Sequence, residues 1–249
     1  GYYNAGQRLD EGLGLLMAAL EKTNHENDTL VIFVGDHGPP FARGKTSVYE
    51  SGARVPFLVY WPEVSRPMRS RAMVSTVDIF PTVCDAANVP MDGDVHGKSL
   101  RAVLQEAEAP WREYLATEFH LHGLNSYSPR RAIRDARYKL IHSLLPDQSR
   151  PLTGIDGDPA YQATREPRYE NTAVRQAFDT FARPPEYELY DLESDPIEFH
   201  NLADDPRMAD VRQRLSRALQ EFRQDTDDPF LDQALLESYR RYANPPNQK

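Results

Sequence analysis

Residues 30–62, LVIFVGDHGPPFARGKTSVYESGARVPFLVYWP, are the most informative stretch of this chain. They open on a continuous apolar run, residues 30–34, which is rich in β-branched and aromatic side chains and is typical of a strand buried on both faces of a parallel sheet. Asp36 and His37 follow the run, and Gly38-Pro39-Pro40 stops any continuation of the strand. Because ligands of open α/β sheets bind beyond the carboxyl ends of the strands, this turn is a candidate site.

The residue types in the turn indicate a cation and an anion. A carboxylate beside an imidazole suits a divalent metal, although Ca²⁺ and Mg²⁺ prefer oxygen ligands and imidazole is more usual on transition metals. Lys45, a little further along, places a positive charge that suits an anion. The alternative is structural: Asp36 caps a helix, His37 is a loop histidine with satisfied hydrogen bonds, and Lys45 is solvated. The residues alone leave both interpretations open.

Four ordered blocks of sequence carry a resemblance to a known family. The blocks are Asp36-His37-Gly38 with Gly44-Lys45, Val48-Tyr49-Glu50, Gly52, Arg54-Val55-Pro56 and Trp61-Pro62; residues 74–82; residues 131–134 with 137–141; and residues 188–192 with Asp195-Pro196, Glu198 and Asn201-Leu202-Ala203. Together they resemble the second signature region and the C-terminal segment of the sulfatases, metal-dependent hydrolases of the alkaline-phosphatase superfamily. The resemblance extends over nearly the whole chain, in the order of the family.

The resemblance and the hydrophobic patterns together predict an α/β protein. Residues 1–110 are expected to form the C-terminal part of an alkaline-phosphatase-like layered catalytic domain. Residues 111–249 are expected to form a smaller C-terminal subdomain with a short antiparallel sheet, an insertion at about 146–186 and a terminal helix. Apolar spacing predicts helices at 9–20, 78–87, 99–107, 172–182 and 208–222, and strands at 30–34, 57–60, 114–119, 131–135, 137–143 and 187–192.

The resemblance implies hydrolysis of a sulfate ester or sulfamate, on a sugar or glycosaminoglycan. Asp36 and His37 would hold part of a divalent metal site, with Ca²⁺ usual in the family and Mg²⁺ or Mn²⁺ as alternatives. Lys45 would be the catalytic residue that steadies the sulfate group and the leaving group. Glu118 with two histidines, His120 and His122, would bind the substrate, against the alternative of a solvated loop.

The nucleophile of this family is a formylglycine made from the first residue of a Cys/Ser-x-Pro-x-Arg motif. The resemblance places it upstream of this chain, so the fragment alone is expected to be inactive and to need the N-terminal part of the same protein. Cys84, the single cysteine, lacks the Pro and Arg that the motif requires. Residues 65–69, SRPMR, fit the short pattern but fall downstream of the metal turn, so we expect no modification there.

Within the family, the chain is most similar overall to the heparan N-sulfatase branch. His37 and Lys45 depart from that branch, which tends to carry asparagine and arginine there, so sulfamate and sulfate ester both remain open. Metal ligands cannot separate sulfuryl from phosphoryl transfer, which leaves a phosphodiesterase or phosphonate monoester hydrolase of the same superfamily as an alternative. An alternative of another class is a non-catalytic module that binds sulfated glycans.

Composition sets further bounds. A net charge of −9 and an isoelectric point near 5.3 argue against a nucleic-acid partner, which requires basic patches. The single cysteine excludes an internal disulfide framework, and no apolar run approaches the ~20 residues of a membrane span. Residues 225–228 are expected to be a solvated helix end, and Glu50 to pair with Arg54 as a loop brace. The resemblance implies a periplasmic, secreted or lysosomal location.

Overall fold

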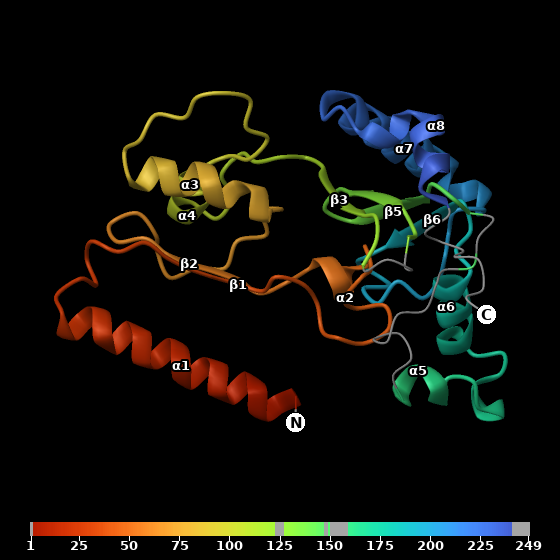
Figure 1. Ribbon diagram of the computed structural model, residues 1–249, viewed down its shortest axis with the longest axis horizontal. Helices are drawn as coiled ribbons and strands as arrows, with labels where there is room; N and C mark the ends of the chain where they lie inside the picture. The colour runs from red at the N-terminus through yellow and green to blue at the C-terminus, as the bar shows by residue number, and fades with distance from the viewer. Residues whose placement is uncertain (1, 123–126, 147–148, 150–158, 241–249) are drawn as a thin grey trace. The chain divides into compact units, whose positions relative to one another are not determined.

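The computed structural model describes residues 2–122, 127–146, 149 and 159–240 (Figure 1). The contacts divide the chain into two compact units, one of residues 1–34 and 56–112 and one of residues 35–55 and 113–249. The domain boundaries expected from the sequence, 1–110 and 111–249, remain a prediction. Residues 35–55, which carry the candidate metal turn, group with the second unit although they follow a strand of the first.

The first unit contains a two-stranded sheet that pairs the two apolar runs of residues 30–62. Strand β1 pairs antiparallel with β2, with Val31 opposite Tyr60 and Val34 opposite Phe57. The expected parallel pairing of this apolar run is therefore wrong for the strands described, and β1 is half-buried rather than covered on both faces. The physical reason is that apolar content does not encode direction, and the chain between the two strands holds no long crossover helix. The elements are α1 (Tyr2–Lys22), β1 (Val31–Val34), β2 (Phe57–Tyr60), the 3-10 turn η1 (Thr76–Asp78), α3 (Ile79–Ala86) and α4 (Arg101–Gln105).

A buried carboxylate, Asp78, ties the helices of the first unit together. It accepts hydrogen bonds from the backbone N–H groups of Ser75 (2.7 Å) and Lys98 (2.9 Å) and from both terminal nitrogens of Arg112. Because it is fully buried and saturated with donors, its charge is compensated. The hydroxyl of Ser65 closes the turn after β2 against Trp61, a structural role. None of the helices in the described part of the chain is long and apolar enough to cross a bilayer.

The second unit contains a four-stranded antiparallel sheet, as the sequence predicted, and its strand order is β3-β4-β5-β6. The register places Thr117 opposite Ala132 and Ala132 opposite Ile141. Successive side chains of a strand alternate between the two faces, so each face of this sheet has its own partners. The strands are β3 (Leu115–Phe119), β4 (Arg130–Arg134), β5 (Tyr138–Ser143) and β6 (Tyr187–Asp191).

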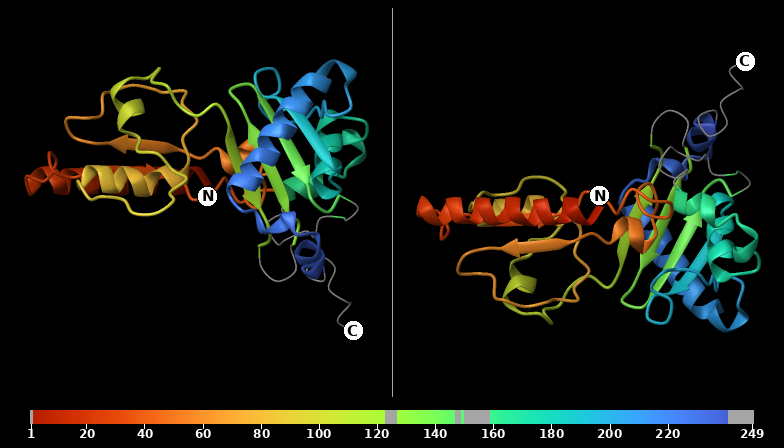
Figure 2. Two further views of the ribbon diagram at one scale, coloured as in Figure 1. Left: turned by 90° about the horizontal axis from the view of Figure 1, so that it is seen from above. Right: turned by 90° about the horizontal axis from the view of Figure 1, so that it is seen from below.

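One face of the sheet is covered by the long helix α7 (Ala209–Asp225), which crosses the strands in Figure 2. Leu215 and Leu219 of the helix pack on Ile133, Leu140 and Leu189 of the strands. Burying each such side chain stabilises the fold by about 1.5–3 kcal/mol. The predicted amphipathic helix at 208–222 is thereby confirmed. Beyond it lie the 3-10 turn η4 (Pro229–Leu231) and α8 (Gln233–Ser238), which the sequence did not predict; the 3-10 turn η3 (Pro206–Met208) precedes it.

The opposite face of the sheet is covered by α6 and by part of residues 35–55. Phe181 of the helix and Val48 and Tyr49 pack against Ala132 and Ile141. Helix α6 (Ala173–Ala182) confirms the helix expected inside the insertion. Part of that insertion lies outside the described residues, and its described remainder adds α5 (Pro159–Ala163) and the 3-10 turn η2 (Pro167–Tyr169).

Candidate functional site

Residues 35–55, here called the site loop, carry the candidate metal turn and Lys45 and end in the short helix α2 (Glu50–Ala53). The loop is folded back on itself by backbone hydrogen bonds, from Gly38 N to Gly52 O (2.9 Å) and from Lys45 N to Pro39 O (2.9 Å). These approaches need residues without a Cβ: one added at Gly38 would lie 1.8 Å from the carbonyl oxygen of Ser51.

Replacing Gly38 with alanine should therefore destabilise the second unit, because the clashing atom belongs to the backbone. We expect a loss of about 1–3 kcal/mol in the free energy of unfolding, measured by urea titration. Gly14→Ala is the control, since nothing lies within 4 Å of a Cβ added at this exposed position of α1. Alanine there should be neutral or stabilise by up to about 1 kcal/mol. Equal stability of the Gly38→Ala variant and the wild type would contradict the loop geometry.

Asp36 and His37 lie side by side at the start of the site loop. The carboxylate of Asp36 is 86% exposed, and its Oδ2 lies 3.2 Å from Nε2 of His37. The other ring nitrogen of His37, Nδ1, lies 2.7 Å from the carbonyl oxygen of Gly38. Because a carbonyl only accepts, Nδ1 carries a proton; a protonated ring would form an ion pair with Asp36 through Nε2, and a neutral ring presents the Nε2 lone pair on the side of the carboxylate. Two electron-pair donors facing each other suit a cation, and a backbone partner on the far nitrogen is usual for a metal-binding histidine.

Lys45 lies in the tightest part of the site loop. Its neighbours Arg43 (φ 68°) and Thr46 (φ 69°) both adopt the left-handed conformation, which is uncommon for residues other than glycine. The lysine is half-buried, and within the described ranges no carboxylate pairs with its ammonium group. The loop therefore offers a cation from a sharply constrained backbone, as an anion-binding role requires.

Glu50, at the end of the site loop, pairs with the sheet rather than within the loop. Its carboxylate contacts Arg134 (2.5 Å) and Lys139 (3.1 Å). Burial alone would raise the pKa of Glu50, but the two cations, with a smaller contribution from Arg54, lower it overall. The expected ion pair between Glu50 and Arg54 is therefore wrong. The carboxylate pairs instead with Arg134 of β4 and Lys139 of β5, which are distant in sequence.

The three residues predicted to bind substrate are placed elsewhere. Glu118 lies within β3, and its carboxylate contacts Arg131 (3.2 Å) and His120 (3.4 Å). The neighbouring residue, Phe119, packs with the cluster beneath the site loop, so Glu118 points to the other face of the sheet. His120 packs on Phe230 with ring centroids 5.0 Å apart, and His122 is exposed. The structure brings Glu118 and His120 together but not with the site loop; substrate binding by these three stays a prediction.

The acidic run at 225–228 is not a solvated helix end throughout. Asp225 and Asp227 are exposed, but Asp228 is buried and accepts hydrogen bonds from Arg131 (2.7 and 2.9 Å) and Arg223 (2.6 Å). Burial alone would raise the pKa of Asp228, yet the two guanidinium groups hold it well below its usual range. The exposed neighbours gave no sign of this exception, because one of the two partners of Asp228, Arg131, lies 97 residues away in sequence.

Sequence reasoning also missed a buried polar layer beneath the site loop. The hydroxyl groups of Tyr49 and Tyr190 both donate to the carboxylate of Glu188, at 2.6 and 2.5 Å. Arg43 stacks on the ring of Tyr49, 3.9 Å from its centroid. Burial and the neighbouring charge of Glu188 raise the pKa of Tyr49 strongly, so it stays a neutral donor. Tyr49 and Glu188 both lie in quoted blocks, but only the three-dimensional contact shows that they pair.

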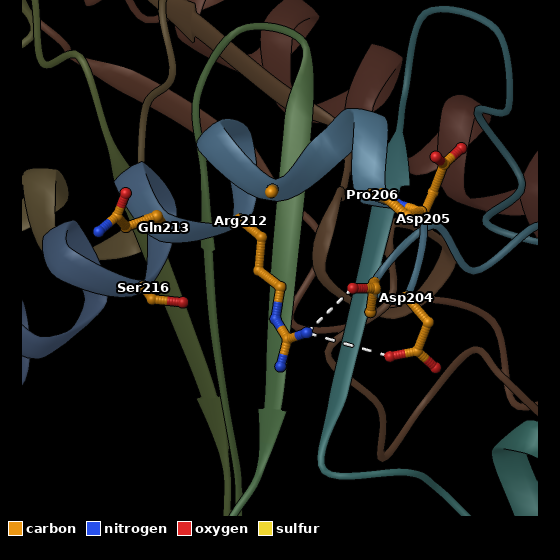
Figure 3. A pocket seen from close by; sticks show the side chains of 8 residues that line it. Asp204, Asp205, Pro206, Arg212, Gln213 and Ser216 are labelled. Carbon is orange, nitrogen blue, oxygen red and sulfur yellow. Dashed lines mark hydrogen bonds and ion pairs between the residues drawn. The ribbon is translucent and has the colours of Figure 1, made fainter.

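An open hollow at the start of α7 is separate from these residues. Figure 3 shows Arg212 reaching from the helix toward the carbonyl of Ala203 (3.0 Å) and the exposed carboxylate of Asp204 (4.0 Å). The guanidinium also lies over the ring of Tyr187, 4.8 Å from its centroid. The hollow includes none of the predicted site residues.

The described part of the chain shows no complete metal site. Within residues 2–122, 127–146, 149 and 159–240, no group of three or more His, Cys, Asp and Glu side chains is gathered as for a metal ion. Asp36 and His37 fit two positions of such a site by their geometry, and further oxygen ligands would be needed to hold Ca²⁺.

Comparison with known proteins identifies the family. The family model described as Sulfatase matches residues 1–89. The human N-sulphoglucosamine sulphohydrolase is 33% identical over 92% of this chain and 48% of its own length. The chain belongs to the sulfatase family. It corresponds to the C-terminal part of its sulfatase relatives and spans about half the length of this human relative.

Solved sulfatase structures share the fold. One, described as a complex with its substrate D-glucosamine-2-N,6-O-disulfate, is 25% identical with a TM-score of 0.66, over 88% of this chain and 39% of its own. The phosphonate monoester hydrolase of Silicibacter pomeroyi, 22% identical with a TM-score of 0.61 over 87% of this chain and 38% of its own, shows the same fold alone. The chain thus has the alkaline-phosphatase-like α/β fold of sulfatases over their C-terminal portion.

Proposed function

We propose that the protein containing this chain hydrolyses a sulfate ester or a sulfamate on a sugar. The observation that carries the proposal is the facing pair of Asp36 and His37, at 3.2 Å, within the part of the chain that matches the sulfatase family model. The human relative is named for cleavage of N-sulphoglucosamine, and one structural neighbour was solved in complex with a disulfated glucosamine, its substrate. Both relatives favour a sulfated sugar.

The site loop would supply two of the functions that sulfuryl transfer requires. Asp36 and His37 would hold one side of a divalent metal, with Ca²⁺ as our proposal and Mg²⁺ or Mn²⁺ as alternatives. Such a metal, when bound, polarises sulfate oxygens and stabilises the negative charge of a nucleophile. Lys45 would hold a sulfate oxygen and balance negative charge that develops on the leaving oxygen or nitrogen. Sulfatases generally use a formylglycine nucleophile, which we propose lies in sequence outside these 249 residues.

The test is turnover of three substrates by the protein that contains this chain: release of sulfate from an aryl sulfate and from N-sulfoglucosamine, and hydrolysis of a phosphodiester. We expect sulfate release with Ca²⁺ present, and its loss both on addition of EDTA and in an Asp36→Ala variant. Asp92→Ala is the matched control, because Asp92 is exposed and lies outside the site loop.

Each other outcome selects a different function. Faster turnover of the phosphodiester would favour a phosphodiesterase or phosphonate monoester hydrolase, which shares this fold. No turnover of any substrate, with saturable binding of a sulfated glycan, would favour a non-catalytic binding module. Sulfate release that survives both EDTA and Asp36→Ala would overturn the assignment of the metal ligands.

A further inference from the structure

Two distant parts of the chain meet at Glu198, a residue of the C-terminal block that the proposed function does not use. Glu198 lies in the turn between β6 and α7, with a φ of 57° and 1% of its surface exposed. Its side-chain Oε2 accepts a hydrogen bond from the backbone N–H of Glu50, at 2.6 Å, across 148 residues of sequence. That N–H begins α2 and has no partner inside the helix, so the carboxylate satisfies a part-buried donor.

The backbone of the turn that contains Glu198 also binds Arg43, which lies seven residues before Glu50 in the site loop. The carbonyl oxygens of Glu198 (2.7 Å) and Ile197 (3.0 Å) accept hydrogen bonds from Nη2 of Arg43. Nη1 of Arg43 donates to the carbonyl of Ala177 in α6, at 3.1 Å. A planar guanidinium shared by three carbonyls fixes both the position and the orientation of the residue that bears it.

The charges around Glu198 are balanced. Nζ of Lys139 lies 3.1 Å from Glu198 and 3.1 Å from Glu50, and Glu50 also pairs with Arg134. Two cations thus compensate two carboxylates beneath the site loop. Burial nevertheless raises the pKa of Glu198, which indicates that its desolvation is only partly offset. Removing a buried carboxylate such as that of Glu198 is costly, because its partners, Lys139 and the N–H of Glu50, then lose that acceptor.

Lys45 lies between the two tied residues, two positions after Arg43 and five before Glu50. We propose that Glu198 is a positioning residue, which fixes residues 43–50 on the four-stranded sheet and so sets where Lys45 presents its ammonium group. Glu198 acts through the backbone and does not touch the substrate. The effect on turnover rests on the proposed function, whereas the effect on the loop does not.

The first test is hydrogen exchange of backbone amides in the protein that contains this chain, followed by mass spectrometry of peptides. Glu198→Ala should raise exchange across residues 43–53 about tenfold or more, because the hydrogen bond to Glu50 N is lost, while exchange in β4 and β5 rises much less. Glu198→Gln keeps an acceptor oxygen, so it should restore much of the protection. Glu193→Ala is the control, with a side chain 75% exposed near the same turn.

The second test separates positioning from general stability by steady-state kinetics of sulfate release by the protein that contains this chain. Glu198→Ala should lower kcat about tenfold with little change in KM, and Glu198→Gln should recover part of it. Unchanged loop exchange, or an equal rise in every peptide, would overturn the proposal, as would raised loop exchange with unchanged kcat. If the wild type releases no sulfate, the proposed function fails, and the exchange data alone then decide whether Glu198 fixes the loop.

Discussion

Replacing Lys45 with alanine is expected to lower kcat for sulfate release about 10²–10³-fold while leaving KM within a few-fold. The lysine is carried by a loop in which both Arg43 and Thr46 have positive φ, so the backbone that bears it is constrained before substrate binds. Preorganised positive charge contributes most where negative charge develops, and alanine removes it without disturbing the backbone hydrogen bond from Lys45 to Pro39. Steady-state kinetics with an aryl sulfate measures the effect.

Two further variants test whether the effect depends on the charge and on the position of Lys45. Lys45→Arg keeps the positive charge, and we expect a smaller loss because a guanidinium differs from an ammonium in shape and hydration. Lys98→Ala removes an exposed lysine of the first unit and should leave kcat unchanged. Equal rates for Lys45→Ala and Lys98→Ala would exclude Lys45 from the reaction.

Replacing Asp228 with alanine is expected to reduce the free energy of unfolding by about 3–5 kcal/mol, the range for breaking a buried ion pair. The side chain is 3% exposed and compensates two buried cations, Arg131 and Arg223, while also accepting from the N–H of Phe230. Alanine removes the carboxylate that the two guanidinium groups share and leaves Arg131 with the more exposed carboxylate of Glu118, at 3.2 Å. Urea unfolding followed by far-UV circular dichroism measures the change, and Asp225→Ala, at an exposed position, should stay within about 0.5 kcal/mol of wild type.

The same carboxylate predicts a pH dependence. The pKa of Asp228 is lower in the folded protein than in the unfolded chain, where it is about 3.9. Its contribution is therefore present above about pH 4 and is lost as the pH falls toward the folded pKa. The difference in stability between wild type and Asp228→Ala should shrink in that acidic range. A difference that stays constant from pH 7 to pH 3 would contradict the assigned ion pairs.

Elements with a strong local pattern could be predicted from the sequence. The helix α7 repeats with the period of one buried face, and its location and those of the strands of the second unit are confirmed. The pairing direction of β1 could not be predicted, because an apolar run is compatible with parallel and antiparallel neighbours alike. Helix α8 is short, so its pattern is too brief to distinguish it from a loop.

The candidate site was predictable where it is contiguous in sequence. Asp36, His37 and Lys45 fall within ten residues and lie in one loop of the structure. The contacts of that loop to Glu188 and Glu198 span more than a hundred residues, and single residues carry no signal of such partners. The prediction of a solvated helix end at residues 225–228 was wrong at Asp228 for the same reason, because this carboxylate is buried although Asp225 and Asp227 are exposed.

The grouping of residues 35–55 with the second unit makes the first unit discontinuous along the chain. A breakpoint near residue 112 would separate the four-stranded sheet from the loop that covers one of its faces. Exchange of this C-terminal region between homologous genes would accordingly join a foreign loop to a native sheet. The region is not an interchangeable module: a functional chimera requires the loop and the sheet to be inherited together.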